Sequence, residues 1–188
     1  MGQGRMTQPP TILPTLLPPA DIHMLAHLAK HAPPGAFCEL GVYRGGSAGI
    51  LYMIAEQQGR TLHLYDTFSG HPDNHDEADD TTCHPPGRYN DGIDPKYLQE
   101  LMPNAIIHIG EFPHTLVDMA PLAFVHSDMD LYHPTLAVCK LLPPMMVPGG
   151  QLYFDDYGHV GCEGVPKAVC EVFGDGPVLE NRKRLVTV

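Results

Sequence analysis

The sequence predicts an α/β fold, in which a Rossmann-like, doubly wound and mostly parallel sheet carries helices on both faces. Short apolar runs alternate with segments of helical periodicity along the 188 residues, and this alternation is typical of a parallel sheet. The run at 36–38 enters a glycine-rich turn, 39–47, that opens a helical pattern. The β-like tail at 177–188 predicts an antiparallel edge near the C-terminus.

The bounds of each predicted helix and strand come from capping residues, from the spacing of apolar residues, and from prolines and glycines that end a helix. Asp21 is expected to cap the first helix, which stops at Pro33-Pro34-Gly35. Apolar runs predict strands at 36–38, 62–66, 105–109, 122–126 and 151–154. Periodic apolar positions predict helices at 21–31, around 50–55, and at 95–101, 112–119, 135–142 and 161–173.

The length fits one domain, which we expect at 20–188. Residues 1–19 are rich in proline and predict an extended arm, either a tail or a strap on a partner subunit. The polar stretch 67–94 predicts a lid-like loop. This loop contains His71 and His84, and a zinc site within it is a weaker alternative to a plain lid.

Charge, apolar runs and cysteine spacing limit the classes of partner and the cellular location that we expect. With 22 acidic and 11 basic residues, the formal net charge is −11, which argues against a nucleic-acid partner. No apolar run has the length of a membrane span, and we expect no membrane contact and a cytoplasmic protein. The five cysteines include no C-x-x-C pair, so reduced thiols are expected. Self-association into a homo-oligomer is left open.

The turn from Glu39 to Ser47 predicts a ligand cradle, because glycines allow close backbone approach at the start of a helix. Its spacing, E-x-G-x-x-x-G-x-S, differs from the dinucleotide and triphosphate fingerprints. The acidic Glu39 repels a pyrophosphate but suits an amine or sulfonium charge. Asp66 ends the next strand, where a carboxylate accepts hydrogen bonds from ribose hydroxyls. An adenosine-bearing ligand is therefore predicted, with an ordinary strand-to-helix turn as the alternative.

Carboxylates also follow two later strands. Asp128 comes after the strand at 122–126, and Asp155 and Asp156 come after the strand at 151–154. Because parallel strands end at the same edge of the sheet, these side chains are expected to meet there. Clustered carboxylates repel one another unless a cation binds them, and oxygen ligands suit Mg²⁺ or Ca²⁺. A divalent metal site is the preferred interpretation, and helix capping is the alternative.

These residues together resemble the macrocin O-methyltransferase (TylF-type) family of metal-dependent class I S-adenosylmethionine methyltransferases. The resemblance covers about residues 35–174 and rests on the Glu39 to Ser47 turn, Asp66, and segments 126–132, 148–150, 154–157 and 161–169. The turn is also similar to that of catechol O-methyltransferases. The resemblance implies that S-adenosylmethionine is bound by Glu39, Gly41, Tyr43, Gly45, Ser47, Asp66, Gly110, Glu111 and Asp128. It also implies that Mg²⁺, or another divalent cation, is bound by Asp128, Asp155 and Asp156.

The implied reaction is methyl transfer to a hydroxyl of a small molecule, with Asp130 as the base that takes the hydroxyl proton. His133 is a rival base, because its unperturbed pKa is better placed for neutral pH. The expected acceptor is a sugar, polyol or related small molecule, and a catechol-like diol is also compatible. Two alternatives remain: a non-catalytic S-adenosylmethionine-binding protein, and another Rossmann-type enzyme that acts on a nucleotide sugar.

Overall fold

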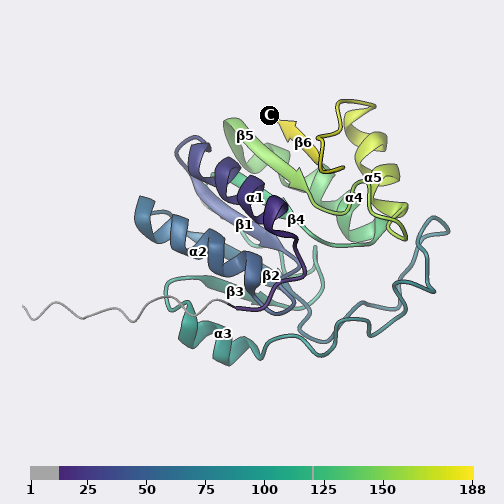
Figure 1. The fold of residues 1–188 in the computed structure, drawn as a ribbon, viewed down its shortest axis with the longest axis horizontal. Helices are drawn as coiled ribbons and strands as arrows, with labels where there is room; N and C mark the ends of the chain where they lie inside the picture. The colour runs from purple at the N-terminus through teal and green to yellow at the C-terminus, as the bar shows by residue number, and fades with distance from the viewer. Residues whose placement is uncertain (1–12, 120) are drawn as a thin grey trace, which may run out of the picture.

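The computed structural model describes residues 13–119 and 121–188 of the chain. Within this part, six strands form one sheet in the order β3-β2-β1-β4-β5-β6 (Figure 1). The elements in chain order are α1 (Pro19–His31), β1 (Ala36–Leu40), α2 (Gly46–Gln58), β2 (Leu62–Asp66), α3 (Pro95–Leu101), β3 (Ile106–Ile109), β4 (Leu122–Ser127), α4 (Tyr132–Leu141), the 3₁₀ turn η1 (Pro143–Met145), β5 (Met146–Phe154), α5 (Gly164–Phe173) and β6 (Arg184–Thr187).

Strands β1 to β5 run parallel, and β6 pairs antiparallel with β5. This confirms the predicted fold class and the antiparallel edge. β1 lies between β2 and β4, so the strand order reverses at β1. The loops that follow β1 and β4 leave in opposite directions at such a switch point, which places the ligand crevice of an open α/β sheet at the carboxyl ends of these strands.

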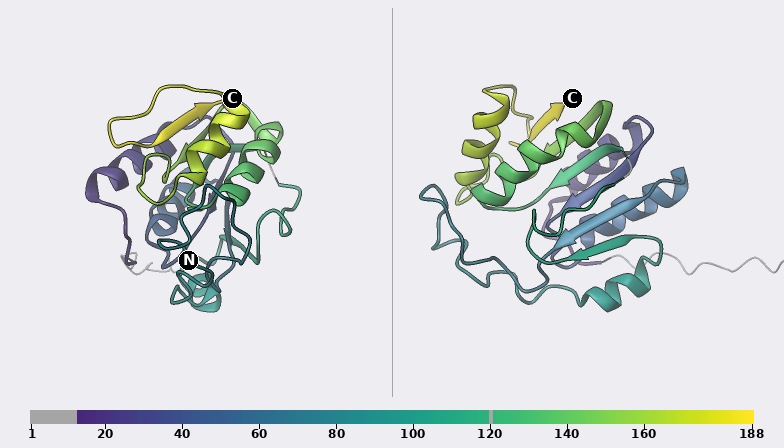
Figure 2. Two further views of the ribbon diagram at one scale, coloured as in Figure 1. Left: turned by 90° about the vertical axis from the view of Figure 1, so that its right-hand side faces the viewer. Right: turned by 180° about the vertical axis from the view of Figure 1, so that it is seen from behind.

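Helices cover both faces of the sheet (Figures 1 and 2). One apolar cluster joins α1, α2 and α3 to one face and includes Leu25, Leu51 and Leu98. A second cluster joins α4 and α5 to the other face and includes Val138 and Val169. All five of these side chains are fully buried. The two clusters hold the central strands rigid, so their carboxyl ends form a fixed platform.

Asp21 does not cap α1, contrary to the expectation from sequence. The helix begins at Pro19, because proline has no N–H to satisfy and its φ suits the first helical position. Asp21 instead lies buried in the first turn, where its carboxylate is 3.6 Å from Lys183 Nζ and accepts a hydrogen bond from Asn181. It thereby anchors the C-terminal tail to α1.

Helix α4 starts three residues earlier than predicted, and a contact distant in sequence explains this. Asp79, in the 67–94 segment, accepts a hydrogen bond of 2.9 Å from the backbone N–H of Tyr132. Asp79 therefore accepts a hydrogen bond from a backbone N–H of the first helical turn that would otherwise be free. The N-cap residue of α4 makes no such side-chain bond. Helix α5 starts at Gly164 instead of 161, and β5 starts at Met146 instead of 151, with a register irregularity opposite β4.

The predicted helix at 112–119 is wrong. The segment makes one turn, closed by a bond from Leu116 N–H to Pro113 O, and then extends. Phe112 and Met119 both contact Tyr65, the first ring to ring and the second through its sulfur. The two contacts with Tyr65 fix both ends of the segment, and the chain between them makes a single turn instead of a helix.

Residues 67–94 contain turns and bends but no helix or strand, as predicted. The segment runs from the end of β2 across to α4 and α5 (Figures 1 and 2). Besides the Asp79 contact, Lys167 of α5 forms an ion pair with Asp76. Most of the proline-rich arm, residues 1–12, lies outside the described residues. We refer to 67–94 as the lid segment below.

Candidate active site

A cavity of about 570 Å³ lies at the carboxyl ends of the parallel strands, a size typical of small-molecule sites. Four strand ends contribute to its wall: Gly41 follows β1, Asp66 ends β2, Asp128 follows β4, and Asp155 and Asp156 follow β5. The lid segment and Leu16, Leu17 and Pro18, before α1, line other parts of it. The structure therefore brings the predicted cradle and the predicted carboxylates into one space.

The glycine turn depends on close contact between two backbones. Gly41 has φ +88°, and a Cβ there would overlap the carbonyl oxygen of Asp128. Asp128 N–H in turn donates to Leu40 O at 2.9 Å. Gly45, with φ +81°, is the N-cap of α2. Only glycine combines the positive φ with the close approach required at position 41.

Asp66 fastens this turn to β2. One of its oxygens accepts hydrogen bonds from the backbone N–H groups of Val42, at 2.6 Å, and Tyr43, at 3.0 Å. The other accepts from Phe68 N–H at 2.7 Å. A carboxylate oxygen has more than one lone pair, so Asp66 retains acceptor capacity toward the cavity that it lines.

The remaining residues implied for the cofactor fall into two groups. Tyr43 and Glu111 line the cavity. Glu39 and Ser47 are buried, and neither they nor Gly45 and Gly110 are among the residues that line the cavity. Gly110 N–H donates to Asp66 O at 2.9 Å, which attaches the turn after β3 to the end of β2.

A buried histidine connects the two halves of the site. His126 Nδ1 lies 2.8 Å from Glu39 Oε1, and its Nε2 lies 3.7 Å from Asp155 Oδ1. Burial acts to lower the pKa of His126, but Asp155 and Glu39 outweigh it and raise the pKa to about 9. The ring is therefore a cation at neutral pH. Glu39 Oε2 is buried and has no partner among the described residues.

Asp128, Asp155 and Asp156 each offer an oxygen to a common point, with these atoms all within 4.8 Å of one another. Burial and then the neighbouring carboxylates raise the pKa of both Asp128 and Asp156. Asp155 differs, because His126 and Lys183 outweigh its burial and lower its pKa. Lys183 Nζ donates to Asp155 Oδ2 at 2.6 Å. Carboxylates that hold one another's pKa high are under-neutralised, so this oxygen set fits a divalent cation.

Asp130 lies beside this set. It has a positive φ of 59°, and its backbone N–H donates to Asp156 Oδ2 at 3.1 Å. Burial, followed by the charge of Asp156, raises its pKa. His133, the rival base, is an exposed residue in the first turn of α4 and lines the cavity. Among the described residues, no hydrogen bond joins His133 to the carboxylates.

Two histidines of the lid segment reach Asp130, which the sequence did not predict. His71 Nε2 lies 3.4 Å from Asp130 Oδ2, and His84 Nδ1 lies 3.6 Å from Asp130 Oδ1. Burial, with His84 as the second cause, lowers the pKa of His71 to about 4. Lys183, which lines the cavity and donates to Asp155, is a further residue of the site that sequence reasoning missed. For His71 and His84, the only signal in the sequence was that histidines occur in a long polar loop.

Comparison with protein families decides the reaction class. Residues 38–157, from β1 to just past β5, match the family described as "Methyltransferase domain". The chain belongs to this methyltransferase family. The methyltransferase is an S-adenosylmethionine-dependent O-methyltransferase, as the related proteins also indicate. This favours methyl transfer over the two alternatives left open by the sequence.

Two curated relatives are named as O-methyltransferases. The mycinamicin III 3''-O-methyltransferase of Micromonospora griseorubida is 28% identical over 178 residues, which cover 81% of this chain and 68% of that protein. The 8-demethyl-8-(2,3-dimethoxy-alpha-L-rhamnosyl)-tetracenomycin-C 4'-O-methyltransferase of Streptomyces olivaceus is 26% identical over 172 residues, covering 76% and 64%. The chain thus spans about two thirds of the length of either relative.

The fold is similar to that of solved methyltransferases. The structure of CalS11, a calicheamicin methyltransferase, superposes with a TM-score of 0.74 at 22% sequence identity. The matched region covers 89% of this chain and 77% of the CalS11 chain. In the part of the methyltransferase that the structure describes, no helix combines the length and the apolar character needed to cross a membrane.

Proposed function

We propose that this methyltransferase is a TylF-type, Mg²⁺-dependent enzyme that methylates a hydroxyl of a sugar in a larger natural product. The observation that supports it most is the shared cavity, in which the glycine turn and the carboxylates at the ends of β4 and β5 line one wall. A ligand held by the turn would therefore lie next to the groups that can activate a hydroxyl.

The sugar acceptor is supported by the relatives. One is named for methylation at the 4'-O position of a rhamnosyl-tetracenomycin, and the other for methylation at the 3''-O position of mycinamicin III. The cavity is lined by polar side chains together with Leu16, Met129 and Phe112. Polar groups suit the hydroxyls of a sugar, and the apolar ones suit an attached aglycone.

Asp128, Asp155 and Asp156 would hold the divalent cation. The set fits such an ion, because three carboxylate oxygens lie within 4.8 Å of one another and His126 and Lys183 lower the pKa of Asp155 alone. When bound, the cation supplies positive charge that stabilises a developing alkoxide and lowers the pKa of the acceptor hydroxyl. Lys183 restrains Asp155 by its short bond to Oδ2 and leaves Oδ1 without a hydrogen bond.

Asp130 would remove the acceptor proton. Asp130 lines the cavity two residues before the start of α4, and its raised pKa makes it a stronger base than an ordinary aspartate. The bond from its N–H to Asp156 fixes the position of its backbone relative to the other carboxylates. His133, exposed at the rim of the cavity, is the alternative base.

Asp66 would bind the ribose hydroxyls of S-adenosylmethionine, whose sulfonium supplies the methyl group. Tyr43 and Gly41 would line the methionine side, with Glu39, Gly45 and Ser47 behind them, and Gly110 and Glu111 would lie near the adenine. Glu39 supports this arrangement, since its buried Oε2 has no partner among the described residues and its charge suits an amino group. The fixed cradle keeps the reacting atoms aligned, which is the main requirement of an in-line transfer.

Methyl transfer to a panel of rhamnosides and other deoxysugar glycosides, measured by mass spectrometry, tests the proposal. Activity is expected with Mg²⁺ and is expected to disappear with EDTA and in Asp156→Asn. Asp73→Asn, which changes an exposed aspartate of the lid segment, is the matched control and should retain activity. Methyl transfer that is equally fast in EDTA would refute the metal requirement. Methyl transfer to catechols but not to glycosides would refute a sugar as the acceptor.

A further inference from the structure

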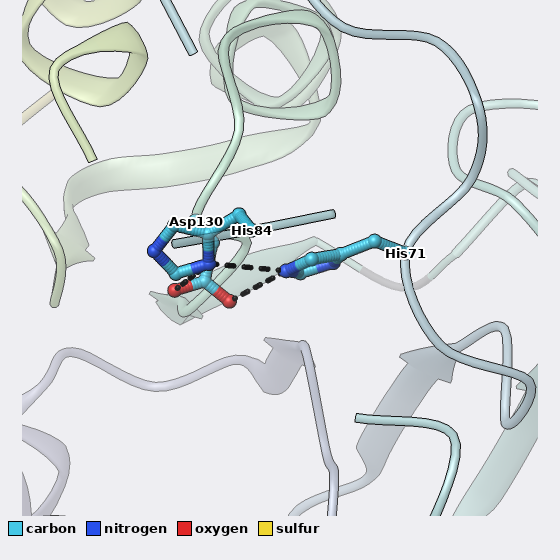
Figure 3. Close-up of side chains that lie close together, drawn as sticks. All are labelled: His71, His84 and Asp130. Atoms are coloured by element: carbon cyan, nitrogen blue, oxygen red, sulfur yellow. Dashed lines mark hydrogen bonds and ion pairs between the residues drawn. The ribbon is translucent and has the colours of Figure 1, made fainter. Parts of the chain in front are cut away.

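Three side chains from two separate segments converge beside the carboxylate set. His71 and His84 come from the lid segment, and Asp130 comes from the turn between β4 and α4. Figure 3 shows the two imidazole rings pointing toward the carboxylate of Asp130 and toward each other. The His71 Nε2 and His84 Nδ1 atoms are 3.3 Å apart, and each lies within 3.6 Å of an Asp130 oxygen.

The spacing of these atoms matches a metal coordination sphere. Zinc binds nitrogen and oxygen ligands at about 2.0–2.1 Å, so two such ligands in a tetrahedral site lie about 3.3–3.4 Å apart. His71 Nε2 lies 3.3 Å from His84 Nδ1 and 3.4 Å from Asp130 Oδ2, and His84 Nδ1 lies 3.6 Å from the other carboxylate oxygen, Asp130 Oδ1. One atom from each of the three side chains lies within 4.8 Å of the other two, so a small rotation of the Asp130 carboxylate places the three ligands on one face of a tetrahedron, with a fourth position open.

We propose that His71, His84 and Asp130 form a second metal site, which takes a divalent transition ion such as Zn²⁺. Its chemistry is distinct from that of the neighbouring set, because imidazole nitrogen favours Zn²⁺ and related ions, whereas carboxylates alone favour Mg²⁺. Three protein ligands with one open position are typical of zinc sites that also bind water or a substrate.

Contacts around the two rings hold them in position. His84 Nε2 lies 3.4 Å from Cys162 Sγ, so the nitrogen that faces away from Asp130 also has a partner. His75 Nε2 lies 2.8 Å from the backbone oxygen of His84, and Tyr89 packs edge-on against His71 at 5.3 Å between ring centroids. Such outer contacts fix the orientation of histidine ligands in metal sites.

A metal ion bound at this site would restrain the lid segment and occupy the Asp130 carboxylate. An ion bound by all three ligands ties the lid segment at two points to the turn after β4. It also engages the Asp130 carboxylate, so, if Asp130 is the base of the proposed function, Zn²⁺ inhibits methyl transfer by removing that base. This inhibition rests on the proposed function, whereas the existence of the metal site does not.

Titration of the apo protein with Co²⁺ tests the site without S-adenosylmethionine or an acceptor. Excess Mg²⁺ is present throughout to occupy the carboxylate set. We expect the intense visible absorption of four-coordinate Co²⁺, abolished by one equivalent of Zn²⁺. His71→Ala and His84→Ala should each weaken binding about 100-fold, whereas His114→Ala, which changes an exposed histidine of the same cavity, should bind as the wild type does.

Limited proteolysis provides a second readout in the same samples. Zn²⁺ should protect the lid segment from cleavage in the wild type and in His114→Ala, but not in His84→Ala. Circular dichroism of each variant checks that it is folded, and His71→Gln replaces His71→Ala if the latter is not. Wild-type Co²⁺ affinity in both histidine variants, or only the weak absorption of six-coordinate Co²⁺, would show that the cluster is only hydrogen bonded. Neither outcome depends on whether the chain methylates sugars.

Discussion

Glu39 and His126 form a fully buried ion pair, with 2.8 Å between Oε1 and Nδ1. Glu39 belongs to β1, beside the glycine turn, and His126 belongs to β4, two residues before Asp128. The second nitrogen of the ring is directed to Asp155 at the end of β5. One ring thus partly neutralises acidic groups beside the glycine turn and at the end of β5.

Removing His126 should strongly destabilise the fold. In His126→Leu, the carboxylate of Glu39 remains buried without a partner, and breaking a buried pair from one side costs about 3–5 kcal/mol. Urea unfolding followed by fluorescence or circular dichroism measures this loss. The double variant Glu39→Gln/His126→Leu removes the stranded charge and should recover part of the stability. A single variant within 1 kcal/mol of the wild type, on the order of a surface pair, would contradict this account.

The contact between Gly41 and Asp128 predicts an unusual sensitivity to a single methyl group. Gly41→Ala should lower the free energy of unfolding by about 3 kcal/mol or more, because it adds an overlap with Asp128 O to the strain of a positive φ. It should also weaken binding of S-adenosylhomocysteine at least about tenfold, since 1.4 kcal/mol of distortion suffices for that. Calorimetry and chemical denaturation measure the two effects.

Gly59→Ala is the matched control for that variant. Gly59 also has a positive φ, of 65°, but a Cβ there meets no atom within 4 Å. It should cost only about 1–2 kcal/mol and leave ligand binding unchanged. Equal losses in the two alanine variants would mean that backbone strain alone, and not the close approach to Asp128, explains the need for glycine at position 41.

The fold and half of the site could be predicted from the sequence because local patterns encode them. Strand-like runs followed by glycine or aspartate identified Gly41, Asp66, Asp128, Asp155 and Asp156, and a parallel sheet gathers such positions at one edge. This inference needs no contact between distant segments, so the sequence alone suffices to place these residues at one edge of the sheet.

The other half of the site depends on contacts that no local pattern records. His71 and His84 lie in a segment without periodicity, and Lys183 lies in the tail, 28 residues after Asp155 in the chain. The start of α4 was misplaced for the same reason, since its first turn is capped by Asp79 from the lid segment. At 112–119, packing of both ends on Tyr65 overrode the helical periodicity.

Asp130→Asn separates catalysis from binding. The variant should reduce methyl transfer by about 10²–10⁴-fold, the usual contribution of a general base, while S-adenosylhomocysteine binds almost as before. Asparagine tolerates the positive φ of 59° at this position, so the backbone should be unchanged. Stopped-flow or mass-spectrometric rates and calorimetry provide the comparison. Loss of cofactor binding would assign Asp130 a structural role, and unchanged rates would transfer the role of base to His133.

The stability of the sheet should depend on pH through His63. This residue of β2 is buried, and its Nδ1 lies 3.1 Å from His108 Nε2 of β3. Burial, with a smaller contribution from His108, lowers the pKa of His63 from 6.5 to about 4. Since the folded-state pKa lies below the unfolded one, the unfolded chain binds more protons between these values. The stabilisation is therefore present above about pH 6.5 and is lost as the pH falls through about 4.

This loss is on the order of 3 kcal/mol and can be isolated with His63→Phe, which keeps an aromatic ring but cannot be protonated. Urea unfolding at pH 7 and pH 4 should show a larger drop for the wild type than for the variant, because carboxylate titration is common to both. A nuclear magnetic resonance titration of the His63 ring gives its pKa directly. Identical pH profiles, or a ring that titrates near pH 6.5, would mean that water reaches His63 between β2 and β3 and that its neutral form is not required by the fold.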